Sequence, residues 1–259
     1  MIHNIIKDKP ARLFLILAGF FVANAIIAEI IGVKIFSLED TIGVNKADFT
    51  LMGVDHLSFS LSVGVIPWPV VFVLTDIINE YYGVKGVRFL SLLTVTLIFF
   101  AFFVFYFAIL ASPDTAFWTT SYAREGVPDM QAAFAAIFGQ GMNIIIGSIT
   151  AFLLGQLADA LVFRKIKVMT GEKSIWMRAT MSTLVSQLID SFVVTYIAFY
   201  LFRGVSLGQC TAWALTAYTY KFCIAILMTP VVYLIHWIAE RYLGKETAKQ
   251  MKESAMSGY

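Results

Sequence analysis

The chain has 259 residues, of which 59% are hydrophobic and only 14% are charged, and its formal net charge is +2. Soluble domains carry about 25% charged residues, so this composition is typical of a polytopic membrane protein, and the small net charge does not favour nucleic acid as a partner. The two cysteines, Cys210 and Cys223, fit neither a disulfide framework nor a metal-ligand pattern. We expect one membrane domain over residues 1–259, without a cofactor or a metal ion.

The distribution of apolar residues predicts an all-α integral membrane protein with six transmembrane helices. Each predicted helix is near or above the roughly 20 residues that cross a bilayer. The first apolar run is too long for the core of a signal peptide, so we expect a retained helix. The last is long enough to tilt or to protrude into the cytoplasm. The predicted spans are Arg12–Val33, Val63–Tyr82, Val87–Ala111, Met142–Phe163, Met181–Phe202 and Ala212–Glu240.

Lysine and arginine are distributed unevenly between the predicted loops. Fourteen of them fall on one side: Lys7, Lys9, Arg12, Lys85, Arg88, Arg164, Lys165, Lys167, Lys173, Arg178, Arg241, Lys245, Lys249 and Lys252. Four fall on the other side: Lys34, Lys46, Arg124 and Arg203. Because cytoplasmic loops carry the excess of positive charge, both termini are expected in the cytoplasm and loops 34–62, 112–141 and 203–211 outside.

The outer loops contain three local signals. Alternation over Leu57–Ser62 and a turn at Gly43 predict a short hairpin before the second span. Asp129–Phe138 reads as a short interfacial helix that ends at the glycines before the fourth span. Trp68 falls near the outer interface, where we interpret it as a membrane anchor. The Phe-rich third span is expected to face lipid.

The second span carries three polar residues, Asp76, Asn79 and Glu80. They are spaced i, i+3 and i+4, so they share one face of a helix. Polar groups are costly in lipid, and this face should therefore look into protein or water. The alternative is that they cap or solvate a helix end at the membrane boundary, which applies more to Glu80 than to the deeper Asp76.

Four other spans also carry polar residues at depth. They are Asn24 in the first span, Gln156 and Asp159 in the fourth, Gln187 and Asp190 in the fifth, and Tyr220 and Lys221 in the sixth. Lys221 is the only Lys or Arg that falls clearly inside a predicted span, so it needs a carboxylate partner, Asp190 first and Asp76 second. A buried ion pair with amide hydrogen bonds between helices would explain one such pair. Polar groups on five of six helices favour a hydrated, polar central cavity.

Few enzyme mechanisms fit these residues. The three histidines, His3, His56 and His236, form no H-E-x-x-H motif, which argues against a metal hydrolase. The sequence also lacks the G-x-x-x-x-G-K-[ST] motif of a nucleotide-binding loop. We therefore do not expect this chain itself to drive transport with ATP. The remaining enzymatic alternative is an intramembrane aspartyl mechanism that uses two of the Asp residues.

Four motifs, in order along the chain, resemble the queuosine precursor transporter family, also called the vitamin uptake transporter family. They are TDIINEYYG at 75–83, GQLADALVF at 155–163, SQLIDSFVVTYIAF at 186–199 and YKFCIAILMTP at 220–230. The resemblance implies a six-helix importer in the cell inner membrane for 7-cyano-7-deazaguanine and 7-aminomethyl-7-deazaguanine. It also implies that the polar intramembrane pattern of the family is matched by Asn24, Asp76, Gln156, Asp159, Gln187, Asp190 and Lys221.

A guanine-like ligand suits these side chains. One carboxylate, Asp190 or Asp76, accepts hydrogen bonds from N1–H and the neighbouring amine. Gln156 or Gln187 meets the O6 side, Lys221 donates to O6, and an aromatic ring such as Tyr220 stacks on the base. Asn79 and Glu80 complete the predicted substrate-binding set.

The energy source is left open by the residues. A carboxylate buried near mid-membrane can carry a proton with the substrate, so the main hypothesis is a proton-coupled or facilitated importer. The alternatives are a substrate-binding subunit that needs a separate energising module, and an intramembrane aspartyl-type enzyme. The expected partners are a small deazapurine, membrane lipid and protons, with a homo-oligomer left open and nucleic acid not expected.

Overall fold

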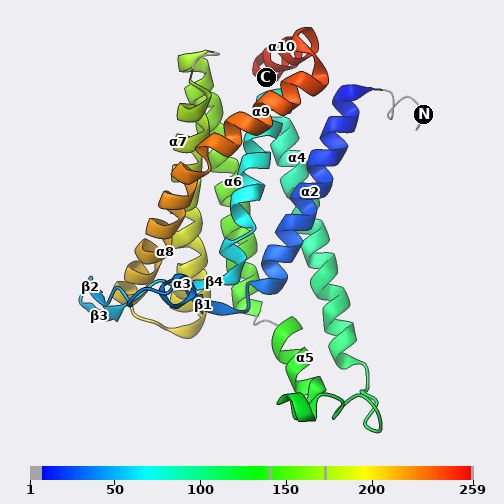
Figure 1. Ribbon diagram of the computed structural model, residues 1–259, viewed down its shortest axis with the longest axis vertical. Helices are drawn as coiled ribbons and strands as arrows, with labels where there is room; N and C mark the ends of the chain where they lie inside the picture. Colours follow the sequence, from blue (N-terminus) through cyan, green and yellow to red (C-terminus); the bar gives the residue numbers. More distant parts are fainter. Residues whose placement is uncertain (1–7, 140–141, 172–173, 258–259) are drawn as a thin grey trace.

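The computed structural model describes residues 8–139, 142–171 and 174–257, and its long helices form a bundle (Figure 1). His3, Lys7, Gly141 and Lys173, which the sequence predictions used, lie outside the described residues. The long helices are α2 (Lys9–Ile31), α4 (Trp68–Leu110), α6 (Met142–Thr170), α7 (Ile175–Thr195, extended by a π-helical turn, Tyr196–Leu201) and α8 (Leu207–Leu227). Within the described residues, five helical segments are long and apolar enough to cross a membrane.

Helix α2 begins where the sequence supplies a helix start. The side chain of Asp8 accepts a hydrogen bond from the backbone N–H of Ala11 at 3.1 Å, and Pro10 occupies the first turn. Proline is tolerated there because its missing N–H would have no partner in the helix. The helix runs to Ile31, close to the predicted span Arg12–Val33.

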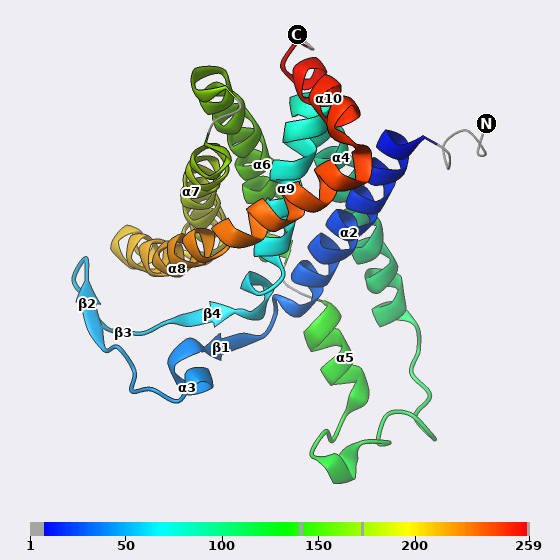
Figure 2. The same cartoon turned by 45° about the horizontal axis from the view of Figure 1, so that its top comes forward.

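Helix α4 contains both the second and the third predicted spans, separated at Gly83. This glycine has φ 69° and ψ −177°, a backbone conformation that side chains with a Cβ rarely adopt. Figures 1 and 2 show one half of α4 rising to this point and the other half descending from it. The descending half exposes Phe99, Phe103 and Phe107, in agreement with the predicted lipid-facing surface.

Residues 164–178, which follow the fourth predicted span, are mostly helical. The predicted helix boundaries on this side of the bundle were therefore wrong. Helix α6 continues to Thr170, and α7 already begins at Ile175. The chain turns after α6 at Gly171, which has φ +60°. The segment Arg164–Thr170 holds good helix formers and contains no Gly or Pro, so the helix has no reason to end at the last apolar residue.

The predicted sixth span, Ala212–Glu240, is two helices rather than one. Helix α8 starts earlier, at Leu207, and ends at Leu227, and α9 covers Thr229–Leu243. Pro230 lies in the first turn of α9. A proline inside a helix removes one backbone hydrogen bond and collides with the carbonyl four residues earlier, so the chain bends at Met228. After Gly244, α10 (Lys245–Ser257) follows as a separate polar helix.

The first outer loop forms two small antiparallel ribbons instead of one hairpin. Strand β1 (Ile35–Ser37) pairs with β4 (Ser60–Ser62), and β2 (Phe49–Leu51) pairs with β3 (Val54–Leu57), while α3 (Leu38–Ile42) lies between β1 and β2. The predicted turn at Gly43 ends α3 with φ 74°. A 3₁₀ turn, Val63–Val65, then leads into α4.

Glu39 organises this loop from a buried position. Its carboxylate accepts hydrogen bonds from the backbone N–H of Phe59 at 2.8 Å and of Ala47 at 3.4 Å. Burial by itself would raise the pKa of Glu39, but these hydrogen bonds to the charged form bring it below its usual value. One carboxylate thus ties together three segments of the loop.

The second outer loop holds the predicted interfacial helix, α5 (Met130–Phe138), after a short 3₁₀ turn at Ala123–Glu125. Asp129 caps α5 by accepting from the backbone N–H groups of Gln131 and Ala132. The strands and α5 lie at one end of the bundle, and the start of α2 and α10 lie at the other (Figures 1 and 2).

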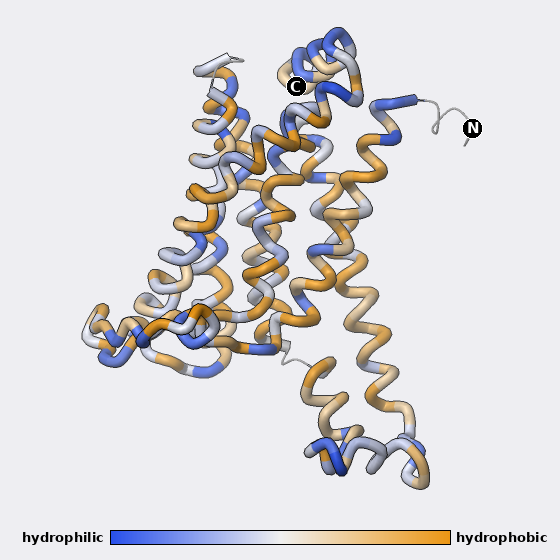
Figure 3. The backbone as a smooth tube through the Cα atoms, viewed as in Figure 1, coloured by the Kyte–Doolittle hydropathy of each residue, from blue (hydrophilic) through white to orange (hydrophobic). Residues whose placement is uncertain are grey.

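The apolar core lies where α2, α4, α6 and α9 meet, around Phe21, Ile77, Ile78 and Leu90. Many large apolar side chains of these helices are exposed, and Figure 3 shows hydrophobic residues along most of their length. A helix that is apolar all round needs lipid on its outer side. Polar side chains inside the bundle are therefore the exception, and most of the buried ones lie on α4, α6 and α7.

Candidate functional site

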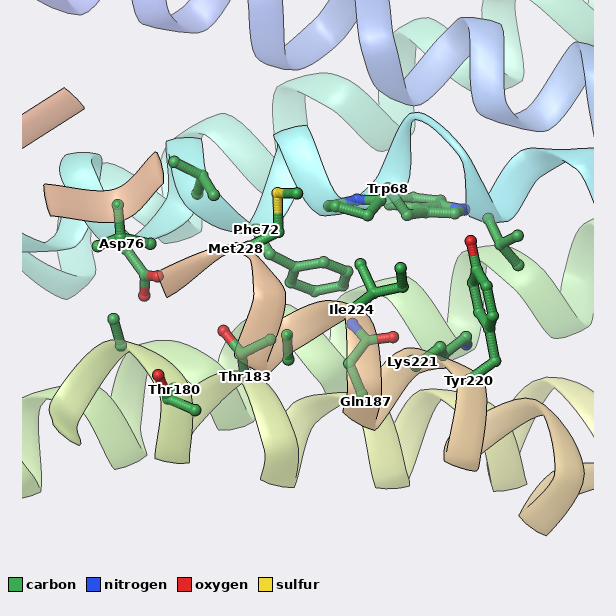
Figure 4. A pocket seen from close by; sticks show the side chains of 16 residues that line it. Trp68, Phe72, Asp76, Thr180, Thr183, Gln187, Tyr220, Lys221, Ile224 and Met228 are labelled. Atoms are coloured by element: carbon green, nitrogen blue, oxygen red, sulfur yellow. The ribbon is translucent and has the colours of Figure 1, made fainter. Parts of the chain in front are cut away.

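A pocket opens between α4, α7, α8 and the start of α9, with about 510 Å³ of space when its open mouth is included. Four of the ten predicted site residues line it: Asp76, Gln187, Tyr220 and Lys221. Figure 4 shows Asp76 and Thr180 at one end of the pocket and Trp68, Tyr220 and Lys221 at the other, with Phe72 between them. The wall is mainly apolar with a few polar groups, which is the usual composition of a small-molecule site.

Asp76 is the acidic group of this pocket. Its side chain points into the pocket from α4 and is 2% exposed, and Oδ1 has no hydrogen-bond partner among the described residues. A buried carboxylate oxygen without a donor is costly unless a ligand or water supplies one. Asp76 is therefore an acceptor that is available to a bound molecule.

Gln187 supplies an available donor. It lies on α7, its side chain is 3% exposed, and Nε2 has no partner among the described residues. Thr180 and Thr183 precede it at spacings of seven and four and line the same pocket. This spacing places all three on one face of α7.

Lys221 and Asp190 form the ion pair that the sequence predicted. Nζ of Lys221 on α8 donates to Oδ2 of Asp190 on α7 at 2.5 Å. The two side chains are 14% and 24% exposed, so the pair is only partly buried. Lys221 itself lines the pocket, and Asp190 lies behind it as its partner.

Trp68 and Phe72 are pocket residues that the sequence reasoning did not assign to a site. Their ring centroids lie 6.1 Å apart, and both line the pocket with Tyr220. Trp68, Phe72 and Asp76 recur every four residues along α4, and such residues share one helix face. This spacing could have identified Trp68 and Phe72 as candidate site residues. The position of Trp68 near the membrane interface favoured its interpretation as a membrane anchor.

Three predicted site residues make hydrogen bonds between helices outside the pocket. Thr75 Oγ1 donates to Gln156 Oε1 at 2.9 Å, and Asn79 Nδ2 donates to the carbonyl of Ala160 at 3.0 Å. Asp159 Oδ1 accepts from Ser186 Oγ at 3.2 Å. These contacts join α4, α6 and α7, and they match the alternative in which polar groups stabilise the bundle.

Helix α2 contributes a different polar residue from the one predicted. Asn24 does not line the pocket; its Nδ2 donates to the carbonyl of Phe20 in its own helix at 2.8 Å. The buried polar residue of α2 is Glu29, whose Oε1 accepts from Ser148 Oγ of α6 at 2.5 Å. The first span therefore stabilises the bundle at Glu29.

Glu80 lies in a buried ionic cluster instead of in the pocket. Oε1 lies 2.8 Å from Nη2 of Arg178, Oε2 lies 3.1 Å from Nζ of Lys167, and Nζ of Lys252 is 4.0 Å away. Arg178 and Lys167 lie near the ends of helices that are long and apolar enough to cross a membrane, and it stays a prediction that Lys221 is the only Lys or Arg clearly inside a span. The alternative in which Glu80 caps or solvates a helix end does not fit, because its side chain is fully buried.

Comparison with known proteins agrees with this architecture. Residues 62–235 match the family model described as "Putative vitamin uptake transporter". A Bacillus subtilis protein named "Probable queuosine precursor transporter" is 27% identical over 190 residues, which cover 70% of this chain and 73% of that protein. A Haemophilus influenzae protein of the same name is 25% identical over 227 residues, 86% of each chain. No solved structure matches the chain.

The family match spans well over half of the chain, including the polar face of α4, the pocket residues of α7 and the Lys221–Asp190 pair. Five membrane-competent helices accompany it. The chain is a multi-pass membrane protein, and it belongs to the vitamin uptake transporter family.

Proposed function

We propose that this protein imports queuosine precursors, 7-cyano-7-deazaguanine and 7-aminomethyl-7-deazaguanine, across the cell inner membrane. Both relatives described above are named for queuosine precursors, and they align with most of this chain. The structural observation that carries the proposal is the buried carboxylate of Asp76, whose Oδ1 has no hydrogen-bond partner among the described residues, inside a pocket with aromatic walls.

The pocket suits the hydrogen-bonding edge of a guanine-like base. N1–H and the exocyclic amine lie side by side on such a base, and one carboxylate accepts both. Asp76 has this capacity free, whereas Asp190 is already neutralised by Lys221. Gln187 Nε2 is the donor available for the O6 side, and the rings of Trp68 and Phe72 provide the flat apolar surface.

The proposed topology has six membrane crossings with both termini in the cytoplasm. The crossings are α2, the two halves of α4 on either side of Gly83, α6, α7 and α8. Helices α9 and α10 then lie at the cytoplasmic end, where the Lys and Arg excess falls. Two buried carboxylates on neighbouring helices, Asp76 and Asp159, are available to carry a proton.

The test is uptake of labelled 7-aminomethyl-7-deazaguanine into cells that lack their own precursor synthesis and transport. We expect uptake with the wild type and a loss of roughly tenfold to a hundredfold with Asp76→Asn, since hydrogen bonds to a charged group contribute about 1.5–3 kcal/mol. Asn24→Ala is the control, because Asn24 lies outside the pocket. A protonophore arm separates proton-coupled from facilitated uptake.

Each result has a defined meaning. Absence of uptake above the empty vector, at matched membrane expression, contradicts the proposed substrate. Uptake that survives Asp76→Asn keeps the function and contradicts the role of Asp76. A fall with Asn24→Ala as large as that with Asp76→Asn would mean that the effect is not specific to the pocket.

A further inference from the structure

The polar face of α4 continues past the pocket toward the end of the bundle that holds α10. Asp76 lines the pocket, and Asn79, one turn further, lines a second and smaller cavity. Val84 and Lys167 form part of the wall of that cavity. The two cavities thus lie in succession along this face of α4, with the smaller one beside α10.

Helix α10 covers this second cavity. Ala255 and Met256 of α10 line it, and the carbonyl oxygen of Ala255 lies 3.0 Å from the position that a Cβ on Gly83 would occupy. Figures 1 and 2 show α10 over the turn between the two halves of α4. Glycine at position 83 thus allows both the turn within α4 and the close approach of α10.

Lys252 of α10 forms ion pairs with the bundle. Lys252 is only 7% exposed, its Nζ donates to Glu240 Oε1 of α9 at 2.5 Å, and it lies 4.0 Å from Glu80 Oε1. The neighbouring pair Lys249–Glu253 is exposed and lies along α10 itself. Ala248 is the apolar residue of α10 that is fully buried, and Met251 packs partly buried against the same core.

We propose that α10 is a lid over the inner end of the transport path, that Lys252 latches it to Glu240 and Glu80, and that it lifts during each transport cycle. The inward direction of passage rests on the proposed function. Glu80, held by Lys167 and Arg178, is the fixed side of the latch, and α10 is the side that moves.

The test measures how fast a cysteine on the covered face of α10 reacts with a thiol reagent. Ala255→Cys is introduced into the full chain with Cys210→Ser and Cys223→Ser, and inside-out vesicles are treated with a hydrophilic maleimide. We expect Lys252→Met to raise the labelling rate roughly fivefold, as the open population grows. Lys249→Met, on the exposed side of the same helix, should leave the rate unchanged. Met256→Cys reads the same cavity if Ala255→Cys does not fold.

A second arm adds 7-aminomethyl-7-deazaguanine to vesicles with Lys252 intact, and we expect faster labelling while substrate is transported. Equal rates in Lys252→Met and Lys249→Met would overturn the latch. A protein that transports substrate without any change in labelling would overturn the lid. Failure of uptake would contradict the proposed function alone, because the Lys252 arm needs no substrate.

Discussion

Two ionic sites among the described residues of the bundle differ in how deeply they are buried. Lys221 and Asp190 form a single pair beside the pocket, with side chains 14% and 24% exposed. At the α10 end, Glu80 and Arg178 are 0% exposed and Lys167 only 3%. One site is a simple pair next to a ligand-sized space, and the other is a carboxylate enclosed by cations.

This difference in burial determines how readily an ion pair can exchange one of its partners for a ligand. A partly exposed pair loses less than a fully buried one when a ligand replaces one partner, because its surroundings are more polarisable and screen the charge that remains. A buried charge that loses its partner is left in a medium of low polarity at a cost of several kcal/mol. Lys221–Asp190 is therefore suited to binding, and the Glu80 cluster is suited to holding α4, α6 and α7 in place.

The largest effect is expected for Glu80→Gln. The substitution leaves Arg178 and Lys167 buried without a counter-charge, so we expect a loss of about 3–5 kcal/mol in the free energy of unfolding. Thermal unfolding of the purified protein in detergent measures it, with Asp190→Asn as the matched control. Equal losses in the two variants would mean that burial does not distinguish the two sites.

A smaller effect is expected at the Lys221–Asp190 pair. Asp190→Asn and Lys221→Met should each cost about 1–2 kcal/mol, and the double variant should recover part of this loss because neither charge is then left alone. A double-mutant cycle by thermal unfolding gives the coupling energy, and uptake assays on the same variants show whether binding depends on the pair. Strict additivity of the two single losses would argue against a direct interaction.

The smallest effect is expected at an ion pair in water. His56 Nδ1 lies 2.8 Å from Asp48 Oδ1 in the outer loop, and this hydrogen bond raises the pKa of His56 above its usual 6.5. The pair therefore stabilises the loop below pH 6.5, and the contribution disappears as pH rises through the raised pKa. Protease protection of the β2–β3 ribbon measured against pH should show a shallow fall, absent in His56→Gln. A rise with pH would contradict the assigned direction.

Helical geometry explains how far the sequence could resolve the polar face of α4. Successive residues turn by about 100° around a helix, so Asn79 and Glu80 point to opposite sides of Asp76 while remaining on its half of the surface. The spacing therefore predicted one inward face correctly. It could not show that Asp76 lines the pocket, that Asn79 bonds to Ala160, and that Glu80 enters an ionic cluster.

Partner choice shows the same limit. The Lys221–Asp190 pair was predictable, because a lone cation inside a span requires a carboxylate and α7 precedes α8 in the chain. The partners of Glu80 were not predictable, because Lys167 and Arg178 read as loop charges once the apolar runs had ended. Helix-forming residues carry α6 beyond its apolar run to Thr170, but they do not show which carboxylate Lys167 contacts.

The sequence by itself determined the membrane class, the family, the inward polar face of α4 and the position of most helices, because these depend on composition and on periodicity within one segment. Only the tertiary structure decided which polar groups line the pocket, which stabilise the bundle, and that α10 covers the end of α4. Those outcomes depend on how distant segments pack. A buried polar group takes whichever partner the fold brings within hydrogen-bonding distance, and sequence spacing does not encode that distance.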